Sequence, residues 1–388
     1  MATNAGGPAP LTFLMYDAYG GDGVVRAVSN VANRLSQHRE VRVISLNRRI
    51  TDPRFTWDPA IDVRALRDFR GGPTRSTVLG RYRSRLRPRP GEPGMSLQTD
   101  FLLRRALRGV RAGLIISTRP SLHLATTTYA RSEVRTVGWD HLNYLARSSN
   151  TRQMEVLRAA VPRLDGYVVL TEADTADYHR DLGPVDTEVA VIRNAVSWTA
   201  DEQPADPENK VIVAAGRMVS RKGFGRMIRA FAPVAREHPD WQLHIYGRGN
   251  RYDAMAKLVT DLGLGSQVVL KGYTRDVQAA FRTASVCAMT STSEGFPMVL
   301  IEAMNVGLPL IAFDCPRGPG EAIVDGRNGL LIPEGPVQAF TEGLRTLVED
   351  VELRRRLGRC ALEDARQYTV DKIAADWERF LARVEARG

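Results

Sequence analysis

Short apolar segments alternate with segments of helical periodicity along this chain, in two separate runs. In the first run, Leu11–Tyr16, Val41–Leu46 and Leu114–Ser117 have the length and composition of buried strands. The segments Val134–Trp139 and Tyr167–Leu170 continue the series. Strand, loop and helix repeated in this order predict a doubly wound parallel sheet.

A second run of the same kind follows the polar stretch Thr199–Asn209. Its expected strands are Lys210–Ala215, Trp241–Tyr246, Val268–Lys271, Val286–Met289 and Leu308–Phe313. We therefore expect an α/β protein of two Rossmann-like domains, residues 1–195 and 196–369, that face a central cleft. Apolar residues at helical spacing over Val370–Val384 predict an amphipathic C-terminal helix, so residues 370–388 are expected to pack back toward the N-terminal domain.

The composition is that of a globular protein, but its charge is divided unevenly. Hydrophobic residues make up 43% and charged residues 25% of the 388 residues, and no run of about 18 apolar residues predicts a membrane span. Residues 1–195 hold 29 arginines, no lysine and 19 acidic residues, so the whole net charge of +10 lies in this half. This excess indicates either a solvated arginine-rich surface or a surface for an anionic membrane or acceptor.

Residues 70–98 interrupt the alternation of strands and helices. They are rich in glycine and proline, and arginines alternate through 81–89. The pattern predicts a long, mobile, basic loop with room for one short helix. Within it, Arg81, Arg83 and Arg85 are candidates for contact with an acceptor.

The most informative motif runs from Ser293 to Met304. Pro297 suits the first turn of a helix, and Gly295 lets a ligand approach the backbone. Free amides at such a helix start would bind an anion such as a diphosphate. One glutamate could then accept hydroxyls of a sugar and the other those of a ribose, with the diphosphate between them. The predicted site for such a nucleotide-sugar donor consists of Glu294, Gly295, Phe296, Pro297, Met298, Val299 and, eight residues after the first glutamate, Glu302. The plainer interpretation is that both glutamates are surface acids of the helix.

Two glycine-containing turns follow predicted strands. Gly216-Arg217 and Lys222-Gly223 place two cations beside a turn, which suits a diphosphate leaving group, although a solvated loop has the same pattern. The loop Gly20–Gly23 follows the first strand, and Gly21 is its candidate phosphate contact. A tight structural turn explains this loop equally well.

A polar cluster follows the strand that ends at Trp139. His141 is a candidate to hydrogen-bond a donor hydroxyl, with Asp140 expected to fix its tautomer and Asn143 nearby as support. A structural histidine is the plainer interpretation. The sequence has no Asp-x-Asp and no His/Cys cluster with metal spacing, so we expect no metal and no cofactor, with Arg217 and Lys222 supplying the positive charge.

Together these residues resemble the retaining GT-B glycosyltransferases of family four, which include bacterial capsule, teichoic acid and lipid glycosyltransferases. The resemblance covers nearly the whole chain, and its most specific element is the Glu294/Glu302 pair. Further matching segments are residues 139–141, 191–196, 216–223, 245–249, 272–274 and 325–333. The chain departs from the family at Arg248, where Asp or Glu is common.

The resemblance implies roles for the matching positions. Glu294 would contact the donor sugar, Glu302 the ribose, and Arg217 with Lys222 the diphosphate. His141 would contact the transferred sugar from the other domain, and Gly21 would let its loop approach the phosphate. The family retains the anomeric configuration, with the departing phosphate oxygen as the acceptor of the proton.

The function expected from the sequence is transfer of a hexose or N-acetylhexosamine from a nucleotide sugar, with UDP favoured over GDP. The acceptor is left open among glycans, wall polymers, lipid-linked saccharides and small molecules. A nucleotide-sugar epimerase and a non-catalytic nucleotide-sugar-binding protein are the alternatives. Three scattered cysteines, Cys287, Cys315 and Cys360, fit a reducing compartment, so we expect a cytoplasmic protein. We also expect peripheral contact at the inner membrane face and no nucleic acid partner.

Overall fold

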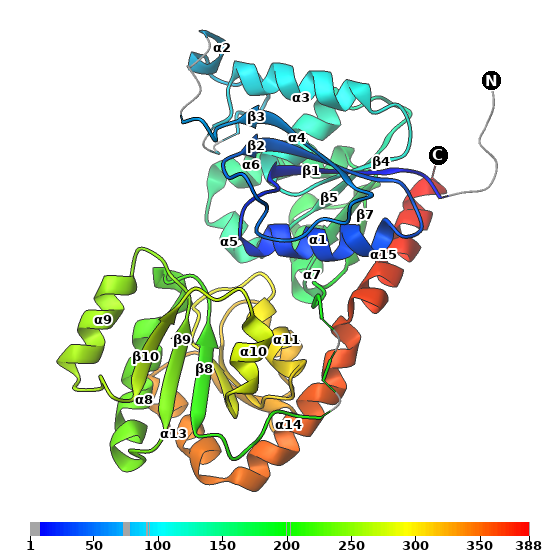
Figure 1. Ribbon diagram of the computed structural model, residues 1–388. Helices are drawn as coiled ribbons and strands as arrows, with labels where there is room; N and C mark the ends of the chain where they lie inside the picture. The colour runs from blue at the N-terminus through cyan, green and yellow to red at the C-terminus, as the bar shows by residue number, and fades with distance from the viewer. Residues whose placement is uncertain are drawn as a thin grey trace. The chain divides into compact units, whose positions relative to one another are not determined.

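The computed structural model describes residues 8–72, 78–90, 92, 94–198, 200–201 and 203–387. Its backbone contacts divide the chain into two compact units, Met1–Ala195 with Val370–Gly388, and Val196–Thr369. We call these the N-terminal unit and the C-terminal unit. Each contains one parallel sheet with helices on both faces (Figure 1), so the expected α/β class with two Rossmann-like domains is confirmed.

The N-terminal unit is built on a seven-stranded sheet in the order β3-β2-β1-β4-β5-β6-β7. Its strands are β1 Leu11–Asp17, β2 Val41–Arg48, β3 Asp62–Asp68, β4 Leu114–Ser117, β5 Arg135–Trp139, β6 Gly166–Val169 and β7 Glu188–Val191. Its helices are α1 Gly23–Leu35, α2 Val78–Arg81, α3 Leu97–Gly109, α4 Pro120–Tyr129, α5 Tyr144–Ser148, α6 Thr151–Ala160, η1 Val161–Arg163, α7 Glu172–Leu182 and α15 Val370–Glu385. The strand order reverses its direction between β1 and β4, and this reversal is where such sheets open a binding crevice.

The C-terminal unit has a six-stranded sheet in the order β10-β9-β8-β11-β12-β13. Its strands are β8 Val211–Ala215, β9 Gln242–Tyr246, β10 Val268–Gly272, β11 Val286–Met289, β12 Leu310–Asp314 and β13 Gly329–Pro333. Its helices are η2 Ser220–Lys222, α8 Phe224–Glu237, α9 Tyr252–Asp261, α10 Val277–Arg282, α11 Met298–Met304, α12 Pro319–Ala322, α13 Val337–Glu349, α14 Val351–Ala365 and η3 Arg366–Tyr368. All the strands run parallel, so their carboxyl ends and the loops that follow them lie at one edge.

The basic segment expected as a mobile loop is held in place where the structure describes it. The carboxylate of Asp100 on α3 accepts hydrogen bonds from the Ser84 hydroxyl at 2.7 Å and from the Arg85 amide at 2.6 Å. Leu86 is buried beside them. The segment does contain the expected short helix, α2, but the expectation of a loop without fixed structure is wrong for these residues, because Asp100 ties it to α3. Arg81, Arg83 and Arg85 are exposed.

The last helix of the chain completes the N-terminal unit. α15 lies beside α1, and its Trp377 is fully buried with its ring 4.7 Å from that of Trp139. Phe380 packs against Gly166 so closely that a Cβ there would lie 2.6 Å from the phenyl ring. Among the described residues, no helix combines the length and the hydropathy that crossing a membrane requires.

Replacing Trp377 by Ala is therefore expected to lower the free energy of unfolding by about 3–5 kcal/mol, because a large buried ring is lost from the core. Urea unfolding followed by circular dichroism measures this change. Arg379→Ala on the same helix is the matched control, since this side chain is 63% exposed, and its effect should stay within about 0.5 kcal/mol. Equal effects of the two substitutions would show that α15 is not part of this core.

Candidate active site

In the C-terminal unit, the loops that follow β8 and β11 meet through side chains and backbone. The Lys222 ammonium donates to the Glu294 carboxylate, with Nζ 2.6 Å from Oε1. Arg221 donates to the Ser293 carbonyl at 3.1 Å and lies 3.6 Å from the other Glu294 oxygen. The structure thus brings together Lys222 and Glu294, which are 72 residues apart in the sequence.

Gly223 is required at this junction because no side chain fits there. Its φ is +67°, and a Cβ would lie 2.0 Å from the carbonyl oxygen of Thr290. The Thr290 hydroxyl also donates to the Gly223 carbonyl at 2.9 Å, and the Thr292 amide donates to the Arg221 carbonyl at 2.8 Å. The turn that carries Lys222 is therefore fastened to the strand end that leads to Glu294, which fixes the spacing between these two side chains.

The motif after β11 places both glutamates away from bulk water. Glu294 is 5% exposed and Glu302, on α11, is 4% exposed, so the interpretation of both as surface acids is wrong. Pro297 is the N-cap of α11 and provides no side-chain hydrogen bond to the helix start, in the region where Gly295, Phe296, Met298 and Val299 lie. The Phe296 ring lies 5.6 Å from that of Tyr368, which holds this turn against η3.

Arg217 and Gly21 differ from the buried glutamates in being exposed. Arg217 is the second residue after β8 and follows Gly216, whose φ is +153°. Gly21 lies in the loop before α1, where a Cβ would come within 3.3 Å of the Arg54 side chain. Asp22 in the same loop caps α1 by accepting from the Val25 amide at 3.1 Å. The loop therefore has a structural role, and its exposed glycine leaves the backbone accessible.

In the N-terminal unit, His141 follows β5 and stacks on Trp139, with ring centres 4.4 Å apart. Both of its ring nitrogens are buried, and neither has a hydrogen-bond partner within the described part of the chain. Burial is the main cause that lowers the pKa of His141 to about 3; Asp140 opposes it, and Arg147 adds to it. His141 is therefore neutral near pH 7 and able to hydrogen-bond as a neutral imidazole.

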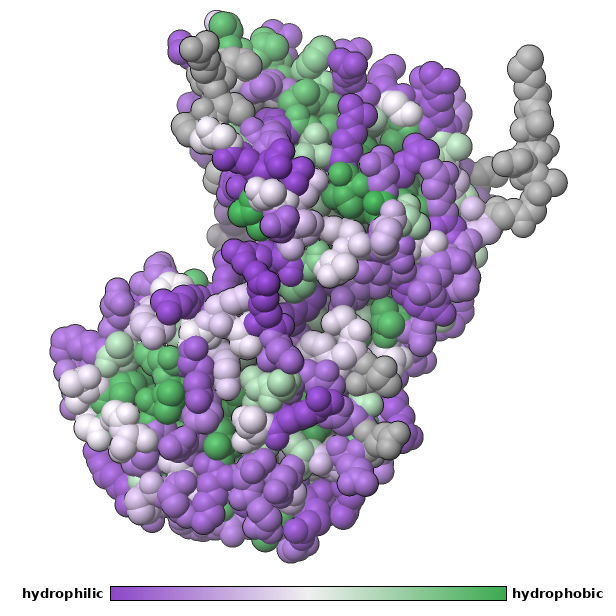
Figure 2. All heavy atoms as spheres, in the orientation of Figure 1, coloured by the Kyte–Doolittle hydropathy of each residue, from purple (hydrophilic) through white to green (hydrophobic). Residues whose placement is uncertain are grey.

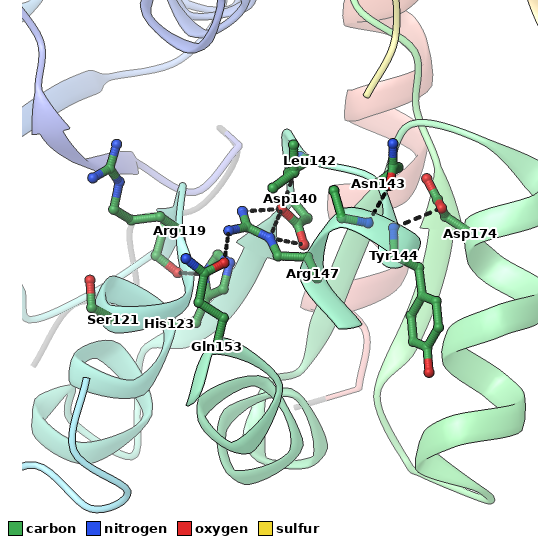
Figure 3. Close-up of polar contacts among 12 residues, drawn as sticks. Arg119, Ser121, His123, Asp140, Leu142, Asn143, Tyr144, Arg147, Gln153 and Asp174 are labelled. Carbon is green, nitrogen blue, oxygen red and sulfur yellow. Dashed lines mark hydrogen bonds and ion pairs between the residues drawn. The ribbon is translucent and has the colours of Figure 1, made fainter. Parts of the chain in front are cut away.

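The expectation that Asp140 fixes the tautomer of His141 is wrong. Its carboxylate instead accepts from Arg147 Nε at 3.1 Å and from the hydroxyls of Tyr167 and Tyr178, both at 2.9 Å. Figure 3 shows this carboxylate facing Arg147, whose guanidinium also donates to Gln153 at 2.9 Å. Burial opposes the charge on Asp140, but the nearby Arg147 outweighs it and holds the pKa of Asp140 at about 2.

Asn143 also has a structural place rather than an exposed one. It is fully buried and caps α5, since its side-chain oxygen accepts from the Ala146 amide at 2.7 Å. Next to it, Asp174 accepts from the Tyr144 amide at 2.9 Å (Figure 3). The segment 140–144 is therefore held at both ends by buried carboxylates, and Asp140 and Asn143 support the loop.

Sequence reasoning missed Arg147, Arg221 and the two tyrosines of this network. Tyr167 reaches Asp140 because β6 pairs with β5, with Trp139 opposite Val168. Nothing in the sequence states that register. Among the described residues, the structure contains no group of three or more His, Cys, Asp or Glu side chains that could hold a metal ion.

Comparisons with known proteins agree with this architecture. The family described as "Glycosyl transferases group 1" matches residues 198–364. An exopolysaccharide phosphotransferase of Streptomyces coelicolor is 30% identical over 97% of this chain, but the chain covers only 41% of that relative's length. The poly(ribitol-phosphate) alpha-N-acetylglucosaminyltransferase of Staphylococcus aureus is 31% identical over 55% of this chain and 43% of its own length.

Among solved structures, S. aureus TarM in complex with fondaparinux, alpha-GlcNAc-glycerol and UDP is similar, with a TM-score of 0.78. The match covers 96% of this chain and 99% of TarM at 17% identity, so it shows the fold alone. The fold expected from the resemblance is confirmed: the chain has the GT-B architecture of TarM. Its residues 198–364 match the model of the group 1 glycosyl transferases.

Removing one charge of the buried Asp140–Arg147 pair should be more damaging than replacing both. Asp140→Asn leaves a buried arginine without its counter-charge and is expected to lower the free energy of unfolding by about 3–5 kcal/mol. The double variant Asp140→Leu with Arg147→Met has no uncompensated charge, so it should lose less. Urea unfolding of the single and double variants measures the coupling. Additive losses would contradict a tightly coupled pair.

Proposed function

We propose that this protein is a retaining glycosyltransferase that moves a hexose or N-acetylhexosamine from UDP-sugar to a cell-envelope acceptor. The observation that carries the proposal is the fastening of the Lys222 turn to the Glu294 loop at the carboxyl edge of the C-terminal sheet. Ligands of parallel sheets bind at this edge. A cation and a carboxylate side by side there suit a ligand with both phosphates and sugar hydroxyls.

In this proposal the C-terminal unit holds the donor. Lys222 and Arg217 neutralise the diphosphate, and the amides at the start of α11 add partial positive charge. Glu294 exchanges its contact with Lys222 for the hydroxyls of the sugar, while the buried Glu302 accepts from the ribose. His141, held neutral by burial, donates to or accepts from a hydroxyl of the transferred sugar.

The chemical step breaks the bond between the anomeric carbon and the phosphate oxygen and forms a bond from that carbon to the acceptor oxygen. The acceptor's proton passes to the departing phosphate oxygen, so no separate general base is needed. Lys222 and Arg217 stabilise the negative charge that grows on the diphosphate. Attack on the face from which the diphosphate leaves retains the anomeric configuration.

The comparisons support the choice of UDP and of an envelope polymer. The structure of TarM contains UDP, and the similar S. aureus enzyme is named as an N-acetylglucosaminyltransferase that acts on poly(ribitol phosphate). A phosphate-containing polymer also suits the N-terminal unit, whose residues 1–195 carry the whole net positive charge. We place such a reaction at the cytoplasmic face of the membrane, where lipid-linked polymers are made, with peripheral contact through the exposed arginines.

Glu294→Gln is expected to leave the fold intact and to lower turnover by about 100-fold or more, because a contact that strengthens in the transition state is lost. Release of UDP from UDP-sugars, measured with and without candidate acceptors, is the assay. Glu342→Gln is the matched control, since this glutamate is 65% exposed on α13. A folded Glu294→Gln variant of normal turnover would remove this residue from the site.

Chelators are expected to leave activity largely unchanged. The positive charge that the diphosphate requires is supplied by Arg217 and Lys222, and the sequence has no Asp-x-Asp for a divalent cation. The measurement is UDP release in excess EDTA, compared with the same reaction after addition of Mn²⁺ or Mg²⁺. Activity that disappears in EDTA and returns with the metal would contradict the proposed role of these cations.

A further inference from the structure

Three arginines from the ends of β2, β3 and β4 lie near Tyr16 at the carboxyl edge of the N-terminal sheet, and two of them contact its ring. Tyr16 is near the end of β1, Arg49 follows β2, Arg67 lies near the end of β3, and Arg119 follows β4. The Arg119 guanidinium lies 4.3 Å from the centre of the Tyr16 ring, and that of Arg49 lies 6.0 Å from it. We call Tyr16, Arg49, Arg67 and Arg119 the edge cluster.

The register of the sheet explains why these residues meet. Leu14 of β1 is opposite Ser117 of β4, so Tyr16 and Arg119 are each two residues farther along. On the other side, Asn47 of β2 is opposite both Asp17 and Arg67. The edge cluster therefore lies across β3, β2, β1 and β4, and it includes the β1–β4 reversal, where a doubly wound sheet binds its ligand.

The edge cluster carries more positive than negative charge. Within the described part of the chain, neither Arg49 nor Arg67 has a carboxylate at ion-pair distance, and Arg119 approaches Glu92 only to 4.0 Å. That Glu92 carboxylate is already engaged by the Ser121 amide and hydroxyl at the start of α4. Burial lowers the pKa of Arg67, Tyr16 opposes this, and the nearby Arg49 lowers the pKa because the two cations repel each other. An anion placed between them would relieve that repulsion.

The arginines are held in position before any ligand binds. Arg67 donates to the Asn47 side chain at 3.0 Å and to the Gly94 carbonyl at 3.4 Å. The guanidiniums of Arg119 and Arg49 lie over the Tyr16 ring, and this cation–π contact stabilises their positions. In Figure 3 the Arg119 guanidinium extends away from Asp140 and Arg147, so it is not part of that buried network. Arginines held in this way offer paired donors to phosphate oxygens at a reduced entropic cost.

We propose that the edge cluster is the acceptor site and that it binds an anionic acceptor, a polyol or saccharide chain carrying phosphate groups. The guanidiniums of Arg49, Arg67 and Arg119 hold one phosphate of the chain, and Tyr16 positions two of them. This inference rests on the proposed transferase function and adds the chemical class of the acceptor. It assigns the site to strand-end arginines rather than to Arg81, Arg83 and Arg85 of the α2 segment.

The test is direct binding, which does not depend on catalysis. A fluorescent glycerol-phosphate oligomer is titrated into the full chain, with fondaparinux as a sulfated probe and maltotriose as a neutral one. Arg49→Gln and Arg119→Gln should each weaken binding of the phosphate oligomer by about tenfold, as expected for loss of a charge-assisted hydrogen bond. Tyr16→Leu should also weaken it, while Tyr16→Phe should restore most of the affinity. Affinity should fall with salt, and maltotriose should bind weakly to every variant.

Two control variants separate this site from general positive charge. Arg111→Gln removes one exposed arginine before β4, at the opposite edge of the sheet, and should leave binding unchanged. Arg81, Arg83 and Arg85 changed together to Ser should have a smaller effect than either edge-cluster arginine. The assignment would be overturned if Arg111→Gln lost as much affinity for the oligomer as Arg49→Gln or Arg119→Gln, or if the triple variant lost more. The assignment would also be overturned if fondaparinux and the phosphate oligomer bound equally well and neither Arg49→Gln nor Arg119→Gln changed that binding.

Two further measurements distinguish this inference from its alternatives. UDP binding should be the same in all these variants. If the protein binds UDP and the oligomer but transfers no sugar, the proposed function is wrong while the edge cluster remains a binding site for the phosphate chain. Co-sedimentation with phosphatidylglycerol vesicles tests a membrane instead of an acceptor. If Arg49→Gln and Arg119→Gln abolish vesicle binding and leave oligomer binding intact, the edge cluster is a lipid surface and the proposal is wrong.

Discussion

Both units depend on one constraint, that every strand of each sheet runs in the same direction. A parallel strand can follow another only through a crossover, so every loop after a strand returns to the same edge. The chain thereby brings Lys222 to Glu294 across 72 residues, and Tyr16 to Arg119 across 103. The helices on both faces hide the rest of each sheet, which leaves these edges as the places where polar groups from distant segments meet.

The two units place charge at their edges in different ways. In the N-terminal unit, Asp140 and Arg147 are at most 7% exposed, and Asp140 accepts from both Arg147 and two tyrosines. A pair so deeply buried and fully bonded cannot exchange partners with a ligand without a large cost. In the C-terminal unit, Lys222 retains 16% exposure of its side chain beside the buried Glu294. That pair can open toward a ligand at lower cost, and this difference separates a structural ion pair from one suited to binding.

The sequence predicted every interior strand but, of the four edge strands, only β10. β4 and β11 are central strands buried on both faces, and their bounds were predicted to the residue. The three strands that were missed, β3, β7 and β13, are all edge strands. The half-buried edge strand β3, Asp62–Asp68, intersperses charged with apolar residues and shows no continuous apolar run.

Parts of the site that are continuous in sequence could be predicted, and contacts between distant segments could not. Motifs that are continuous in sequence, such as Ser293–Met304, carry their own helix start and glycine, so their local geometry follows from the residues. The predicted partner of Asp140 was wrong because adjacency in sequence suggested His141. The actual partners are Tyr167, brought close by the register of β5 and β6, and Arg147 in the last turn of α5. Predicting contacts between strand ends requires knowledge of the strand order, and the pattern of apolar residues does not reveal that order.

The excess of arginine in residues 1–195 gains meaning from this strand order. A count of charges alone cannot separate a solvated surface from a binding surface, and the arginines that alternate through 81–89 are close together only in sequence. The structure places exposed arginines of that segment beside α3, and places others at the reversal between β1 and β4. Only the second group combines three cations, an aromatic support and the one edge position that sheet topology favours for a ligand. Position relative to the sheet, rather than local density of charge, therefore favours this edge as the place of the proposed anionic acceptor.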